Sequence, residues 1–182
     1  YGEMPGDDAT MLGVFFRRRN KAMVFTGPPL DPANDEMLAQ RLINFNGCRI
    51  VCGGTTGEIV ARQLDEEIFP LHDTLRKDVP PRADLEGIDL LTEGVLTLNK
   101  ALELMQRVGD NPTRLPNGDD GAVLLARELL LADDITFLVG QTINPFYQNP
   151  ALPLSTLIRR NLIEKMSDHL RALNKSVRVS YY

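Results

Sequence analysis

Four short loops rich in glycine and threonine contain the residues whose types and spacing could do chemistry. Each follows an apolar run typical of a β-strand, and a helical pattern follows most of them. The first backbone N–H groups of a helix have no partner inside it and carry the positive end of its dipole. Because glycine lets a ligand approach the backbone closely, the loops predict an anion site. The four loops are Thr26-Gly27-Pro28, Gly53-Gly54-Thr55-Thr56, Thr92-Glu93-Gly94 and Gly140-Gln141-Thr142.

The clearest of these loops lies in the stretch 49–63, RIVCGGTTGEIVARQ. A short apolar run stops at two glycines, and apolar residues at helical spacing begin directly afterwards, which predicts a strand, a tight turn and a helix. Thr55 stands where a helix N-cap is expected, and Glu58 three residues later completes a capping box. We therefore expect the helix to begin at Thr55 with its free amides facing a ligand.

Polar side chains in the other loops could complete the site. Glu93 is the one carboxylate that the pattern alone places among these loops, so it could act as a base or hold a cation or a ribose. Gln141 and Asn144 could supply amide hydrogen bonds. The predicted anion-binding residues are Thr26, Gly27, Gly53, Gly54, Thr55, Thr56, Glu93, Gly94, Gly140, Gln141, Thr142 and Asn144. The alternative is that these glycines only permit sharp turns from strand to helix.

Several well-known motifs are missing from the sequence. The glycine loops lack the Gly-Lys-Ser/Thr of a P-loop and the GxGxxG of a dinucleotide site, so the guest could be phosphate, a carboxylate or a nucleotide-like group. There is no catalytic Ser/His/Asp ordering and no metal-binding helix. Cys48 and Cys52 lie about 13 Å apart in one predicted strand, too far to form a disulfide. We expect buried reduced thiols and a cytoplasmic protein.

Strands and helices alternate along most of the chain, which predicts an α/β fold. We expect a three-layer domain, Rossmann-like or flavodoxin-like, with a mostly parallel sheet of about five strands. In such a sheet the four loops share one edge, where open α/β folds bind ligands. The strand order stays open at this point. The longest predicted helices cover residues 95–108 and 154–173, and the last strand covers 177–181.

Two segments do not follow this alternation. Met11–Phe16 and Ala22–Thr26 are both β-type runs, and the polar residues Arg17–Lys21 between them favour a hairpin. Residues 69–86 form a connection rich in proline and charge, which could be a lid, a side hairpin or a flexible loop.

Composition limits the possible partners. The chain has 182 residues, a net charge of -5 and a pI of about 5.1, so it lacks the basic surface expected for nucleic-acid binding. No apolar run approaches the ~20 residues that a membrane span requires, and we expect no membrane contact. The first residue is not methionine, and we expect the chain to be a piece of a longer protein.

The segment GDDATMLGVFF resembles the last metal-site motif and closing strand of metal-dependent (PPM-type) serine/threonine phosphatases. The segments FTGPP, RIVCGGTTGEIVAR, LEGIDLLTEGVLTLNKALEL and INPFYQNPALPLSTLIRRNLIEKM resemble the region that follows the phosphatase domain in a bacterial subgroup, the stage II sporulation protein E family. The resemblance implies that residues 1–20 are the end of the phosphatase domain and residues 21–182 an α/β accessory domain.

The resemblance also implies a parent enzyme that hydrolyses phosphoserine or phosphothreonine with two Mn²⁺ or Mg²⁺ ions and an activated water. Asp7 matches a metal-ligating aspartate of the family, and Asp8 takes its variable Asp/Asn position. The other ligands come from sequence well before this motif, so we expect no phosphatase activity and no tightly bound metal in this chain.

Three hypotheses for the function follow. The first is a regulatory or ligand-sensing domain of a bacterial phosphatase that binds a small anion. The second is an independent enzyme that acts on a phosphorylated metabolite through Glu93 and the helix start at Thr55. The third is an interaction module that forms a homodimer through the helix Ser155–Leu173 or the first hairpin.

Overall fold

A seven-stranded sheet forms the middle layer of the protein, in a computed structural model that describes residues 10–14, 16–142 and 154–182. Its order is β3-β4-β5-β2-β1-β6-β7. Five neighbouring strands in this order are parallel to one another: β5, β2, β1, β6 and β7. The strands are β1 (Lys21–Thr26), β2 (Cys48–Cys52), β3 (Phe69–Pro70), β4 (Ala83–Asp84), β5 (Leu90–Thr92), β6 (Asp134–Val139) and β7 (Ser176–Tyr181). The predicted three-layer α/β class is confirmed, with two more strands than expected.

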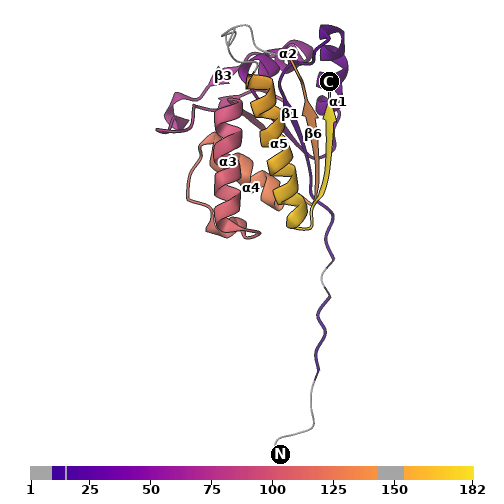
Figure 1. The fold of residues 1–182 in the computed structure, drawn as a ribbon, viewed down its shortest axis with the longest axis vertical. Coiled ribbons are helices and arrows are strands. Elements are labelled where there is room, and N and C mark those ends of the chain that lie inside the picture. Colours follow the sequence, from indigo (N-terminus) through magenta and orange to yellow (C-terminus); the bar gives the residue numbers. More distant parts are fainter. Residues whose placement is uncertain (1–9, 15, 143–153) are drawn as a thin grey trace, which may run out of the picture.

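Helices cover both faces of the sheet (Figure 1). The α-helices are α1 (Asp35–Ile43), α2 (Gly54–Leu64), α3 (Val95–Val108), α4 (Gly121–Leu131) and α5 (Leu154–Ala172), and short 3-10 turns cover Pro32–Asn34, His72–Thr74 and Pro112–Arg114. Residues of α3, α4 and α5 pack into one apolar core, and those of α1 and α2 into the other. The connections that lead from β1 to β5 therefore cross one face of the sheet, and those that lead from β5 to β7 cross the opposite face.

The alternation of side chains along β1 explains why the sheet is buried on both sides. Ala22 and Val24 belong to the core under α3, α4 and α5, whereas Met23 and Phe25 belong to the core under α1 and α2. All four are at most 5% exposed. Such strands read as continuous apolar runs, as is usual for a parallel sheet with two helical layers.

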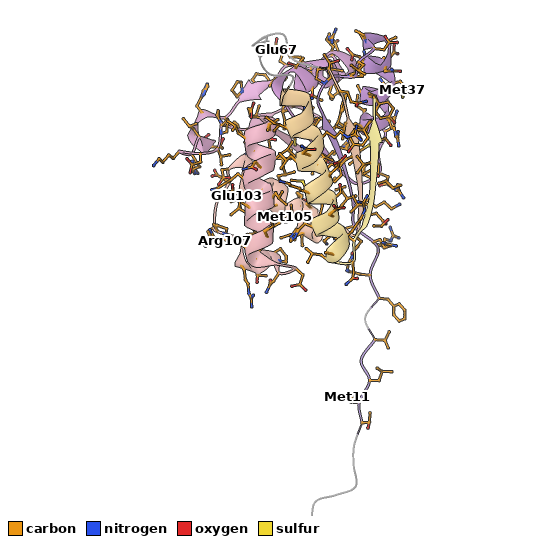
Figure 2. The ribbon with its side chains drawn as sticks, in the orientation of Figure 1. Met11, Met37, Glu67, Glu103, Met105 and Arg107 are labelled. Carbon is orange, nitrogen blue, oxygen red and sulfur yellow. The ribbon has the colours of Figure 1, made fainter. Side chains whose placement is uncertain are left out.

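Helix α3 shows how an amphipathic pattern selects the packed face. Leu98 and Met105 are fully buried, while Glu103 and Arg107 are exposed. Figure 2 shows Glu103 and Arg107 on the outer side of α3, and Met105 among the side chains of the molecular interior. The helix has the bounds that its sequence predicts, Val95–Val108.

The predicted N-terminal hairpin is wrong for the residues that the structure describes. Residues 10–14 and 16–20 form no strand, and they run away from the body of the protein (Figure 1). The physical reason is that β1 already has β2 on one side and β6 on the other, both parallel, so it offers no open edge. Met11 and Phe16 are consequently 96% and 88% exposed, and Figure 2 shows Met11 far out on this arm.

The segment 69–86 forms the side hairpin, one of the three predicted alternatives. β3 and β4 pair antiparallel through two residues each, and β4 continues the sheet antiparallel to β5. These two strands account for the extra strand count, because two-residue strands leave no periodic pattern in a sequence.

Candidate functional site

The carboxyl ends of β1, β2, β5 and β6 lie at one edge of the sheet, because these four strands are parallel. Two loop pairs meet there. The Gly53 N–H donates to the Thr92 carbonyl oxygen at 2.9 Å, which joins the loops after β2 and β5. The Gly140 N–H donates to the Thr26 carbonyl oxygen at 2.9 Å, which joins the loops after β1 and β6.

The strand order reverses between β1 and β6, the place where open α/β folds usually bind ligands. Here the two loops fill that crevice. The Thr142 N–H donates to the Pro28 carbonyl oxygen at 3.1 Å, and the Thr142 hydroxyl donates to the Pro29 carbonyl oxygen. A Cβ atom on Gly140 would lie 2.1 Å from the carbonyl oxygens of Gly27 and Pro28. No ligand has room between these two loops.

A cavity of about 350 Å³ opens beside this crevice, over the loops after β2 and β5. It is lined by Gly27, Pro28, Cys52, Gly53, Gly54, Thr55, Thr56, Glu93, Gly94, Val95, Leu96, Ile158 and Arg159. Seven of these residues belong to the predicted anion site. We call this cavity the strand-end pocket.

The remaining predicted residues are not part of its lining. Thr26 is fully buried, and its hydroxyl has no partner among the described residues. Gly140 and Thr142 are used in the contact between the two loops, and the Gln141 N–H donates to the Tyr182 carbonyl oxygen. Asn144 and Asp7 lie outside the described residues.

The start of α2 differs from the predicted capping box. The helix begins at Gly54, so Thr55 lies inside its first turn and not at the cap. Gly53 takes the N-cap position with φ of 127°, a conformation that favours glycine, and it has no side chain with which to cap the helix. Glu58 is exposed. Because a helix leaves its first N–H groups unpaired, α2 presents uncapped amides at the strand-end pocket.

Helix α3 begins beside α2 at the same pocket. Its N-cap is Gly94, and a Cβ atom on Gly94 would lie 3.6 Å from the Gly53 Cα atom, so the two turns lie close to each other. Gly94 has no side chain with which to cap α3, and the neighbouring Glu93 carboxylate accepts a hydrogen bond from the Gly94 backbone N–H. Two helix dipoles of 11 and 14 residues therefore direct their positive ends toward one cavity.

Arg159 of α5 is the functional residue that sequence reasoning missed. Its Nη1 atom donates to the Gly140 carbonyl oxygen at 3.1 Å, and its guanidinium lies over Gly27. Burial lowers its pKa, and the nearby Glu93 opposes that shift. One signal could have revealed it: Arg159 precedes the buried residues Ile163 and Leu170 by four and eleven positions, which places a charge on the buried face of the helix.

Glu93 brings an opposite charge to the pocket. Its Oε2 atom is buried and has no hydrogen-bond partner in the part of the chain that the structure describes. Burial raises the pKa of Glu93, whereas a hydrogen bond from the Gly94 backbone and the charge of Arg159 oppose the rise. The two side chains form no ion pair with each other among the described residues.

The thiol at the bottom of the pocket is unreactive. Cys52 is 1% exposed, and burial raises its pKa to about 12. A cysteine attacks as its thiolate, so this side chain remains a neutral thiol at physiological pH. Both cysteines are free, as the sequence predicts, but only Cys52 is buried and Cys48 is partly exposed.

A larger hollow of about 630 Å³ lies at the opposite edge of the sheet, at the amino ends of the strands. Arg18, Arg19 and Lys21 contribute to its wall, but so do Glu128 and the C-terminal end of α4. A helix C-terminus carries the negative end of the dipole, and Arg19 is already paired with Asp134 at 3.0 Å. This hollow is therefore a poorer anion site than the strand-end pocket.

Comparisons with family models, with curated proteins and with solved structures found no match. Within the described residues, no helix is both long enough and apolar enough to cross a membrane. The same part of the chain holds no group of three or more His, Cys, Asp or Glu side chains placed to bind a metal ion.

Proposed function

We propose that residues 21–182 form a ligand-sensing accessory domain that binds a small anion in the strand-end pocket. The observation that carries this proposal is the convergence of two helix N-termini, both with glycine at the N-cap, and the Arg159 guanidinium on one cavity. Helix N-termini bind carboxylates and phosphates because their N–H groups and dipoles both favour negative charge. A guanidinium adds a permanently charged donor with a planar fork.

The parent protein is, in this proposal, a metal-dependent protein serine/threonine phosphatase. The resemblance of GDDATMLGVFF to the family's last metal-site motif supports it, with Asp7 as one ligand of Mn²⁺ or Mg²⁺. Asp7 and Asp8 alone do not provide the ligands for two cations, so we assign no phosphatase chemistry to the described residues. Ligand binding at residues 21–182 would regulate hydrolysis carried out elsewhere in the parent enzyme.

A thermal-shift experiment with inorganic phosphate and with carboxylates tests the anion site. At 100 times the dissociation constant, binding should stabilise the folded protein by ~2.7 kcal/mol. Gly54→Val should remove this shift, because a side chain there enters open space in the pocket. Gly13→Val is the matched control, since Gly13 also faces open space but lies on the N-terminal arm. Equal shifts in all three proteins would place the anion elsewhere.

A second candidate is an enzyme that acts on a phosphorylated metabolite, and the raised pKa of Glu93 favours it. A carboxyl group whose pKa moves toward neutrality can act as a general base or acid. Turnover of a phosphorylated metabolite that disappears in Glu93→Gln would support this candidate. Binding without turnover would favour the sensing domain.

The homodimer remains a further prediction, but its proposed contact through α5 is used within the chain. Ile158, Leu162, Met166 and Leu170 form an apolar stripe along α5, and the last three are buried in the core with α3 and α4. Light scattering over a range of concentrations tests association. A dimer that persists after Ile158→Glu, at the exposed start of this stripe, would not use α5.

A further inference from the structure

Two opposite charges line the strand-end pocket without forming an ion pair with each other. Arg159 donates one N–H to the Gly140 carbonyl oxygen, and Glu93 keeps a buried oxygen without a donor. A buried carboxylate oxygen without a partner is costly, and a ligand that donates a hydrogen bond relieves that cost. Pure anion binding leaves this oxygen unexplained, because a bare anion has no donor to offer.

The positive side of the pocket lies directly beside Glu93. Gly94 follows Glu93 in the chain, and its turn lies close to the start of α2, where the Gly53 N–H donates to the Thr92 carbonyl oxygen at 2.9 Å. A Cβ atom on Gly54 would meet nothing within 4 Å, and Gly54 lines the pocket, so a ligand has room beside the first turn of α2. A ligand that contacts both sides must carry its own positive and negative groups close together.

The net charge of the lining favours a zwitterion over a dianion. One guanidinium and one carboxylate cancel, which leaves the partial positive charges of two helix starts, each roughly half a unit. A phosphate dianion would lie near the Glu93 carboxylate and be repelled by it. A carboxylate joined to an ammonium group satisfies the helix starts and Glu93 together.

An apolar wall completes the pocket. Leu96 of α3 and Ile158 of α5 both line it, although they are 61% and 45% exposed. Val95 lies beside them and is partly buried against the core. Exposed apolar side chains at a cavity are typical of a binding site, and they offer a ligand's hydrocarbon part a contact surface.

We propose that the strand-end pocket binds an α-amino acid with an apolar side chain. Its carboxylate lies at the amides of α2 and at Arg159, its ammonium group lies against the Glu93 side chain and compensates the carboxylate charge, and its side chain contacts Leu96 and Ile158. This inference rests on the proposed anion site and adds the identity of the ligand. The cavity of about 350 Å³ lies at the small end of the range for ligand pockets, roughly 300–1,000 Å³, which suits a molecule of this size.

Isothermal titration calorimetry with three matched probes tests the inference. Leucine carries both charged groups, 4-methylpentanoate lacks the ammonium group, and 3-methylbutylamine lacks the carboxylate. We expect leucine to bind about tenfold or more tightly than either analogue, since each charge-assisted hydrogen bond contributes that much. Valine and phenylalanine, titrated alongside, report how much side chain the apolar wall accepts.

Variants locate the ammonium group. Glu93→Gln keeps the shape of the side chain and should reduce the preference for leucine over 4-methylpentanoate to about twofold or less, because the ionic acceptor is lost. Glu103→Gln is the matched control, since Glu103 is exposed on the outer side of α3. It should keep the preference of the unmodified protein.

The outcomes separate this inference from the proposed function. If 4-methylpentanoate binds as tightly as leucine, or if inorganic phosphate and a nucleoside monophosphate bind while no amino acid does, the inference is overturned and the anion site stands. If no probe binds, both are overturned. Leucine binding that Glu93→Gln leaves unchanged would also overturn it, because the ammonium group would then lie elsewhere.

Discussion

At the scale of single residues, Glu93 is the pocket side chain whose charge is least well stabilised. Its carboxylate is held where burial disfavours the charge, and Arg159 of α5 and the Gly94 backbone compensate only in part. Cys52 of β2 also lines the pocket, and as a neutral thiol it offers Glu93 no opposite charge. In the proposed complex, the positive group of the ligand would offset this cost, and perturbed carboxylates of this kind are common at binding sites.

Glu93→Gln should make the empty protein more stable at neutral pH and not at acidic pH. The folded-state pKa of Glu93 is raised above 4.5, so its protonated form favours folding below that value, and this contribution is lost as the pH rises through the folded pKa. The neutral glutamine has no such loss. The thermal midpoints of the unmodified protein and of Glu93→Gln should be measured from pH 3 to pH 8. The variant should become the more stable of the two as the pH rises above about 4.5, the ordinary pKa of the Glu93 carboxyl group. Parallel profiles would mean that the carboxylate is well solvated.

Sequence reasoning found one charge of the pocket and not the other, for a physical reason. Glu93 follows a strand of a parallel sheet directly, so topology alone places it at the edge. Arg159 comes from the second turn of a helix that returns to this edge after a long connection. Its arrival there depends on where α5 begins and how it packs, which periodicity does not specify.

At the scale of elements, α4 shows what a local capping signal does. Asp120 is 8% exposed, and its Oδ1 atom accepts hydrogen bonds from the Ala122 and Val123 N–H groups at 3.1 Å each. Two aspartates, Asp119 and Asp120, precede the helix, and Asp120 is the one that caps it. Its neighbour Asp119 instead accepts from Arg76 at 2.6 Å on the surface.

Asp120→Ala should destabilise the fold while Asp119→Ala should not. Losing an N-cap carboxylate costs about 1 kcal/mol, and an exposed ion pair contributes roughly 0–1 kcal/mol. For a chain of 182 residues, 1 kcal/mol corresponds to a decrease of the thermal midpoint by about 2–4 °C. Urea unfolding of both variants measures the difference. Equal losses would mean that Asp120 does not act as the cap.

The sequence predicts an element well where its apolar pattern is long and periodic. It predicts poorly where the outcome depends on tertiary structure, such as the strand order or the backbone conformation of a turn. The fourteen residues of α3 carry enough turns of apolar periodicity to specify both ends. The capping box at Thr55 failed because Gly53, with its positive φ, starts α2 earlier than the threonine signal. The first hairpin failed because β1 is a central strand, a fact of strand order.

At the scale of the whole molecule, the loops after β1 and β6 decide where a ligand can enter. Strand order reverses between these strands, yet Gly140 brings the two loops so close that the crevice is filled. The cavity is displaced to the loops after β2 and β5, where α5 adds the Arg159 side chain. The edge that the general siting rule predicts does hold a cavity, but that cavity lies over the loops after β2 and β5 and not between β1 and β6.

Gly140→Ala should test this closure directly. The added Cβ atom would lie 2.1 Å from two backbone carbonyl oxygens, so the loops must move apart, and such overpacking costs roughly 1–3 kcal/mol. Gly54→Ala makes the same chemical change in open space at the start of α2 and should cost nothing measurable. Chemical denaturation of the two variants gives the comparison. If Gly140→Ala were as stable as Gly54→Ala, the loops would have room between them, and the crevice between β1 and β6 would become a rival ligand site.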